Sequence, residues 1–237
     1  MLGLANLGMK RGYFIDSATP FYGAITGLVM MVAYEILIVL EPLKGTMARN
    51  ASEVWFRYMI SFFGVSGHLI TYMMMMISFF LILIFYRQGL IFRVRTFVIM
   101  LLEGALLGLL TGWLIQSLLH SVLWANPSES EARNLGLAIG AGLFEELVFR
   151  VLLIAILYRL FRFFFVFKIP SSVASILTAS FLFSLYHYIG PYSDTFEVYS
   201  FLHRFLGGLW LTSLYFYRGF GIACLTHAFY DIFIVLS

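Results

Sequence analysis

Three short groups of ionisable residues stand inside apolar stretches of the chain, and the first contains Glu145, Glu146 and Arg150. A charged side chain at the depth of a bilayer costs about 3 kcal/mol on insertion scales, so such residues usually mark a functional site. On a helix, residues four apart share a face, whereas successive residues point about 100° apart. We therefore expect Arg150 to neutralise Glu146 and to leave Glu145 free for another partner. A structural ion pair beside a glutamate in a water pocket would give the same pattern.

The other two groups contain histidine. Phe183 precedes His187 by four residues and Asp231 follows His227 by four, so each pair is expected to share a helix face. A carboxylate and two imidazoles that meet in a cavity shielded from solvent can activate a water molecule by general-base catalysis. An imidazole N–H can also stabilise an oxyanion. Glutamate, aspartate and histidine are equally a suitable ligand set for a divalent metal such as zinc.

Two further residues could supply a nucleophile. Cys224 lies three residues before His227, and Ser184 lies three before His187. A lone buried cysteine is more often inert packing, and a serine in a membrane helix usually bonds its own backbone. We therefore expect neither residue to be catalytic. Structural or interfacial roles are expected for the remaining histidines, which are His68, His120 and His203.

The elements that must position these residues are membrane helices. Of the 237 residues, 62% are hydrophobic, 19% aromatic and only 11% charged, which excludes an ordinary soluble domain. The basic residues are spread between apolar runs, so nucleic acid is not an expected partner. A single cysteine excludes an internal disulfide framework. The composition predicts one integral-membrane domain over residues 1–237, an all-α bundle of about seven transmembrane spans.

The predicted spans place each group of ionisable residues on its own helix. In chain order they cover about 19–40, 58–86, 97–124, 135–160, 171–189 and 198–217, followed by a last short helix after residue 221. Glu145 then lies in the fourth span, His187 near the outer end of the fifth, and His227 near the inner end of the seventh. Bringing these depths together requires tilted helices or a last helix that re-enters the membrane.

The orientation in the membrane is predicted from basic residues in the connections between spans. With the N-terminus inside, nine of them fall on the inner side, against four on the outer side. The inner set is Lys10, Arg11, Arg87, Arg93, Arg95, Arg159, Arg162, Lys168 and Arg218, and the outer set is Lys44, Arg49, Arg57 and Arg133. We therefore expect a multi-pass protein of the cell membrane with a cytoplasmic N-terminus. Glu35 and Glu103 are expected to pair with Arg204 or to line the cavity.

Together the three groups resemble the CPBP intramembrane endopeptidases, which comprise the type II CAAX prenyl endopeptidases and the bacteriocin-processing or Abi-type relatives. That family is marked by Glu-Glu-x-x-x-Arg, Phe-x-x-x-His and His-x-x-x-Asn/Asp, each on its own transmembrane helix. In this chain the motifs read EELVFR at 145–150, FSLYH at 183–187 and HAFYD at 227–231. The resemblance covers about 135–233 and includes the stretch that follows Arg204.

The resemblance implies an endopeptidase that cuts a membrane-associated protein or peptide within the bilayer, without a metal cofactor. Carried over by motif, Glu145 and His187 would activate the attacking water, while His227 and Asp231 would hold the oxyanion. The supporting residues would be Glu146, Arg150, Phe183 and Arg204.

One position departs from the prenyl-processing members, which have asparagine where this chain has Asp231. An ionised aspartate cannot donate a hydrogen bond to an oxyanion. Asp231 must therefore be protonated, orient His227 or bind a metal. A zinc-type metalloprotease, a proton-coupled carrier and a non-enzymatic immunity scaffold are the alternative interpretations.

Overall fold

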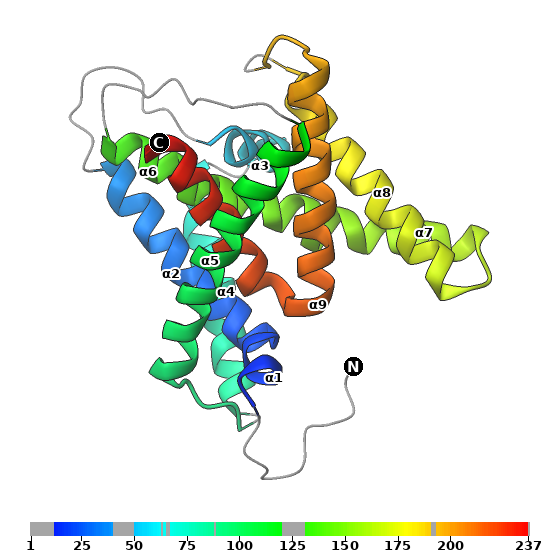
Figure 1. The fold of residues 1–237 in the computed structure, drawn as a ribbon. Helices are drawn as coiled ribbons and strands as arrows, with labels where there is room; N and C mark the ends of the chain where they lie inside the picture. Colours follow the sequence, from blue (N-terminus) through cyan, green and yellow to red (C-terminus); the bar gives the residue numbers. More distant parts are fainter. Residues whose placement is uncertain are drawn as a thin grey trace.

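The computed structural model describes residues 12–39, 50–62, 64, 67–87, 89–119, 131–190 and 193–236, and every regular element in them is a helix. The predicted all-α class is therefore confirmed. In chain order the helices are α1 (Tyr13–Ser17), α2 (Pro20–Val39), α3 (Ala51–Ser61), α4 (Gly67–Arg87), α5 (Val94–Leu119), α6 (Glu131–Gly140), η1 (Ala141–Leu153), α7 (Ile154–Phe164), α8 (Lys168–Tyr186) and α9 (Val198–Leu236), as Figure 1 shows.

Four helices among the described residues, α2, α5, α8 and α9, are long and apolar enough to cross a membrane, so the chain is a membrane protein. The predicted spans map onto the helices with three differences. The predicted fourth span is divided among α6, η1 and α7. The predicted second span is divided into α3 and α4 by a turn in which Gly64 has φ +78°. The sixth and seventh spans are joined as the two halves of α9.

A kink at Gly219 divides α9 into those two halves. Gly219 has φ 79° and ψ 176°, a conformation that L-residues with a side chain rarely adopt. A Cβ atom there would also lie 2.8 Å from the carbonyl oxygen of Ala18. Figure 1 shows the first half of α9 (orange) running to the kink and the second half (red) returning towards the opposite end of the molecule. The chain therefore turns back at Gly219, which carries His227 into the interior.

Helix α5 packs closely against the returning half of α9 through glycines. A Cβ atom at Gly104 would lie 2.6 Å from the Cβ of Leu225, and one at Gly108 would lie 2.8 Å from the backbone nitrogen of Tyr230. Glycines spaced four apart let two membrane helices approach at backbone distance. This contact fixes the helix that carries the third motif.

A cluster of polar residues anchors α1 at the kink. Arg218 pairs with Glu103 through N–O distances of 2.7 and 2.8 Å and donates to the Phe14 carbonyl oxygen at 3.0 Å. The hydroxyl of Tyr13 also donates to Glu103, and burial raises the pKa of Tyr13, which keeps that hydroxyl protonated. The expected alternatives for Glu103, a bond to Arg204 or a place in the cavity, are therefore wrong.

Glu35, the second carboxylate in question, lies 3.8 Å from a guanidinium nitrogen of Arg57. It does not pair with Arg204, whose carboxylate partner is Asp194. The side chain of His68 and several residues used in the sequence predictions, Lys10, Arg11, Lys44, Arg49 and His120, lie outside the described residues.

Candidate active site

The first motif lies on a segment that departs from α-helical geometry. Helices α6, η1 and α7 follow one another without a break, and η1 is wound as a π-helix. Such segments are rare and occur mostly at functional sites. The sequence prediction assumed a regular α-helix here, so the π-helix was missed.

Gly142 brings η1 against the returning half of α9. A Cβ atom at Gly142 would lie 2.7 Å from the Cβ of Ala228 and 2.8 Å from the carbonyl oxygen of Cys224. Only the absence of a side chain permits this approach. The close contact allows the two glutamates of η1 to reach the histidine of α9.

Glu146 connects the first motif to the third. One of its oxygens, Oε1, lies 3.0 Å from Nη1 of Arg150 and accepts a hydrogen bond of 2.7 Å from Nδ1 of His227. The side chains of Glu146 and Arg150 are 0% and 1% exposed, so neither charge is solvated by bulk water. The predicted Glu146–Arg150 pair is present. The bond from His227 to Glu146 was not predicted, because sequence spacing indicates partners on one helix and not across two.

Glu145 lies on the other side of the His227 ring. Its Oε2 is 3.8 Å from Nε2 of His227, and Oδ2 of Asp231 is 3.6 Å from the same nitrogen. The carboxyl groups of three residues thus surround one imidazole. Nδ1 of the ring donates to Glu146, and Nε2 lies between Glu145 and Asp231.

His187 stands at the end of α8, where its ring is fixed from two directions. Its Nδ1 is 2.9 Å from the carbonyl oxygen of Phe183, and because a carbonyl only accepts, Nδ1 carries the hydrogen. In the neutral ring Nε2 is then an acceptor. The Phe183 ring packs edge-on against His187 at 5.2 Å between centroids, and the Arg150 guanidinium lies 4.3 Å above the same phenyl ring.

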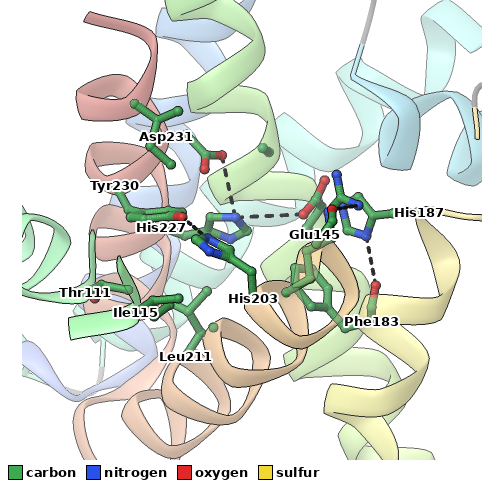
Figure 2. A pocket seen from close by; sticks show the side chains of 15 residues that line it. Thr111, Ile115, Glu145, Phe183, His187, His203, Leu211, His227, Tyr230 and Asp231 are labelled. Atoms are coloured by element: carbon green, nitrogen blue, oxygen red, sulfur yellow. Dashed lines mark hydrogen bonds and ion pairs between the residues drawn. The ribbon is translucent and has the colours of Figure 1, made fainter. Parts of the chain in front are cut away.

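The three motifs meet at one cavity of about 310 Å³. Its lining includes Glu145, Phe183, His187, Arg204, His227 and Asp231. In Figure 2, Glu145 appears between the rings of His227 and His187, with Asp231 above His227. The cavity therefore brings together the residues of the three motifs and Arg204, except Glu146 and Arg150, which do not line it.

Arg204 lines the cavity but is held by residues at its rim. Its guanidinium bonds the carboxylate of Asp194 at 2.6 Å, the hydroxyl of Tyr188 at 3.0 Å and that of Ser200 at 3.0 Å. These contacts join the segment between α8 and α9 to the start of α9. Arg204 therefore supports the cavity by fixing this rim.

The other nucleophile candidates are placed away from the chemistry. Cys224 is 0% exposed and packs in the apolar core. Ser184 donates its hydroxyl to the backbone of α9, at Phe201, over 2.7 Å, and not to its own helix as expected. His203, expected to be structural, lines the cavity and is bonded to Tyr230.

Metal binding was the alternative interpretation for the carboxylates and histidines. Among the described residues, no three His, Cys, Asp or Glu side chains are arranged as a group that could hold a metal ion. That activity does not depend on a metal stays a prediction.

Comparison with known proteins bears directly on these motifs. The family model of Rce1-like type II CAAX prenyl endopeptidases matches residues 131–233, which contain the π-helical segment, α8 and nearly all of α9. Neither the curated proteins nor the solved structures gave a match. The family match covers all three motifs and confirms the resemblance found in the sequence. Residues 131–233, which carry all three motifs, are therefore similar to the Rce1-like type II CAAX prenyl endopeptidases.

Proposed function

We propose that this protein hydrolyses a peptide bond of a membrane-associated protein or peptide, with Glu145 as the general base. The observation that carries the proposal is that the two glutamates face different nitrogens of the His227 ring. Glu146 binds Nδ1 of that ring and is paired with Arg150, whereas Glu145 faces Nε2 at 3.8 Å and opens on the cavity. Glu146 is thus occupied by two hydrogen-bonding or charged partners, and Glu145 is the carboxylate available to a substrate.

Water activation is assigned to Glu145 together with His187. The Nε2 of His187 is an acceptor, since Nδ1 is engaged with the Phe183 carbonyl, and it can orient a water molecule that also bonds Glu145. As the water oxygen attacks the carbonyl carbon of the scissile bond, Glu145 takes up the proton. When the C–N bond breaks, Glu145 returns that proton to the leaving amine, which leaves a carboxylic acid and a free amine.

His227 is assigned to the developing negative charge. In this assignment both ring nitrogens of His227 carry a hydrogen: Nδ1–H is held by Glu146, and Nε2–H points into the cavity. A donor fixed in place before the reaction stabilises an oxyanion without a reorganisation cost. Breaking the bond to Glu146 should therefore impair catalysis even though Glu146 does not touch the substrate.

The substrate class follows from the membrane setting and from the family. The relatives described by the family model are named for prenylated CAAX proteins. We assign to this chain a peptide substrate whose lipid or apolar anchor lies in the bilayer beside the helices.

The test uses the purified full-length chain in liposomes and a quenched fluorescent peptide that ends in a prenylated CAAX sequence, with an unprenylated copy for comparison. We expect the prenylated probe to be cleaved. In Glu145→Gln the cleavage rate should fall at least about 1,000-fold, as when an acid–base residue is removed. Cleavage of both probes would widen the substrate class to unlipidated peptides. No cleavage of either, or full activity in Glu145→Gln, would contradict the proposal and favour a carrier or an immunity scaffold.

A further inference from the structure

A second pair of polar residues lies in the cavity and takes no part in the steps above. His203 belongs to the first half of α9 and Tyr230 to the second, and Nε2 of the ring is hydrogen-bonded to the hydroxyl. Both residues line the cavity. Figure 2 shows them in the same wall as His227 and Asp231.

The burial of His203 indicates which way this hydrogen bond runs. The residue is 5% exposed, and its Nδ1 has no hydrogen-bond partner among the described residues. If Tyr230 donated to Nε2, the single ring hydrogen would be on Nδ1 and would form a buried donor without a partner, which native structures rarely contain. With the hydrogen on Nε2, His203 donates to the Tyr230 oxygen. The hydroxyl hydrogen of Tyr230 is then available to the cavity.

Only one hydrogen-bond donor has so far been assigned to the oxyanion, so a second donor in the cavity could add to its stabilisation. Around the position assigned to the oxyanion stand one N–H, from His227, and two carboxylates, Glu145 and Asp231. Asp231 can donate a hydrogen bond only when its carboxyl is protonated, whereas an asparagine at this position would always carry an N–H donor. Tyr230 is the adjacent residue on the same helix, and a phenolic hydroxyl is a suitable oxyanion donor.

The position of Tyr230 is fixed by helix α5. A Cβ atom at Gly108 would lie 2.8 Å from the Tyr230 backbone nitrogen, so the two backbones are in contact. Thr111 and Ile115, farther along α5, continue the cavity wall beside it. A donor held in this way loses little freedom when the transition state forms.

We infer that the Tyr230 hydroxyl donates a second hydrogen bond to the oxyanion, next to the one from His227. His203 is a positioning residue, because it holds the Tyr230 oxygen and directs the hydroxyl hydrogen into the cavity. This assignment rests on the proposed endopeptidase activity, and it replaces the amide donor that position 231 lacks in this chain.

The test compares Tyr230→Phe in two backgrounds, with the prenylated quenched peptide as probe. In the otherwise unchanged protein, loss of one oxyanion donor should lower kcat about 100-fold and leave KM nearly unchanged. In the Asp231→Asn background the new amide N–H can donate to the oxyanion instead. Tyr230→Phe should then lower kcat less than about 10-fold. Tyr34→Phe is the matched control, since that buried hydroxyl bonds Glu53 outside the cavity, and it should keep its kcat.

His203 gives an independent check if Tyr230→Phe folds poorly. His203→Leu should lower kcat when Tyr230 is present and cause no further loss in Tyr230→Phe, whereas His203→Gln, which keeps an N–H donor, should retain most activity. Equal losses from Tyr230→Phe in both backgrounds, or an unchanged kcat, would overturn the inference. Cleavage that needs Glu145 but not the Tyr230 hydroxyl would contradict this inference alone, while absence of cleavage by the unmodified chain would contradict the proposed function itself.

Discussion

Glu146 accepts a hydrogen bond from His227 and faces Arg150, whereas Glu145, its neighbour in the chain, faces the cavity. Glu146→Gln should strand the buried Arg150 charge and lower the free energy of unfolding by about 3–5 kcal/mol. It should also reduce activity, because an amide holds the His227 cation less firmly than a carboxylate does.

Glu145→Gln is the control for that variant, since it keeps the packing and removes only the proton acceptor. We expect it to melt near the unmodified protein and to be inactive. Melting temperature and peptide cleavage, measured for both variants in detergent, separate the two roles. If Glu145→Gln melted far lower while Glu146→Gln was stable and inactive, the two assignments would have to be exchanged.

Cys224 tests whether a thiol takes part in the reaction. It is fully buried in the apolar core and is not part of the cavity lining. Cys224→Ala should therefore retain activity, and thiol-alkylating reagents should inhibit the unmodified protein little. Loss of cleavage in Cys224→Ala at normal folding and expression would point to a thiol mechanism instead.

Asp231 and the question of a metal are tested together. Because Glu146 already orients His227 through Nδ1, we expect Asp231→Asn to remain largely active and a chelator to have no effect on cleavage. Elemental analysis of the purified protein supplies a readout besides activity. A stoichiometric metal whose removal abolishes cleavage, whose return restores it and whose content falls in Asp231→Asn would establish the zinc-type interpretation.

At the scale of elements, the close approach of η1 to α9 determines whether the two glutamates reach His227. Gly142→Ala would place a methyl group 2.7 Å from both the Cβ and the backbone nitrogen of Ala228, so one helix must shift. We expect a loss of about 1–3 kcal/mol in stability, as for other overpacked sites, and a larger proportional loss of activity because the Glu146–His227 bond lengthens.

Gly27→Ala is the matched control, because a Cβ there would meet the Phe220 ring at 3.6 Å and Cδ1 of Leu143 at 3.9 Å, both ordinary contacts. It should change neither stability nor cleavage appreciably. The comparison uses thermal unfolding and the quenched-peptide assay on the same samples. An active, stable Gly142→Ala variant would show that the site tolerates a wider separation of these helices than the geometry indicates.

The sequence predicted the three motifs, the helices that hold them and the Glu146–Arg150 pair, because each depends on residues close together in the chain. Partners far apart in the chain could not be predicted in this way, because sequence spacing relates only residues on the same helix. The bond from His227 to Glu146 spans two helices, and the pairing of Arg218 with Glu103 joins residues 115 positions apart. The π-helix was missed because hydrophobic spacing does not distinguish it from an α-helix over a few turns. His203 was expected to be structural because its partner, Tyr230, lies on the other half of α9, where sequence spacing does not indicate a contact.

At the scale of the whole molecule, the basic residues predict the side of the membrane to which the cavity opens. Figure 1 shows the α4–α5 connection and the kink of α9 at one end, and α3 with the start of α9 at the other. Arg87, Arg93, Arg95 and Arg218 belong to the former end, and basic residues favour the cytoplasmic side. His187 and the Arg204–Asp194 pair lie towards the opposite end, next to the segment that joins α8 to α9.

We therefore predict that the rim of the cavity faces away from the cytoplasm, so that substrates reach it from the outer side. Single-cysteine variants in the Cys224→Ala background test this, using exposed positions at the two ends, Arg95→Cys and Glu197→Cys. A membrane-impermeant maleimide should label Glu197→Cys on intact cells and Arg95→Cys only after the membrane is opened. The reverse labelling would place the N-terminus outside, and the cavity rim with its Arg204–Asp194 pair would then meet cytoplasmic substrates. A peptide supplied on one side of sealed, oriented vesicles should be cleaved on the side where Glu197→Cys is labelled, since Glu197 lies three residues before Ser200, which lines the cavity.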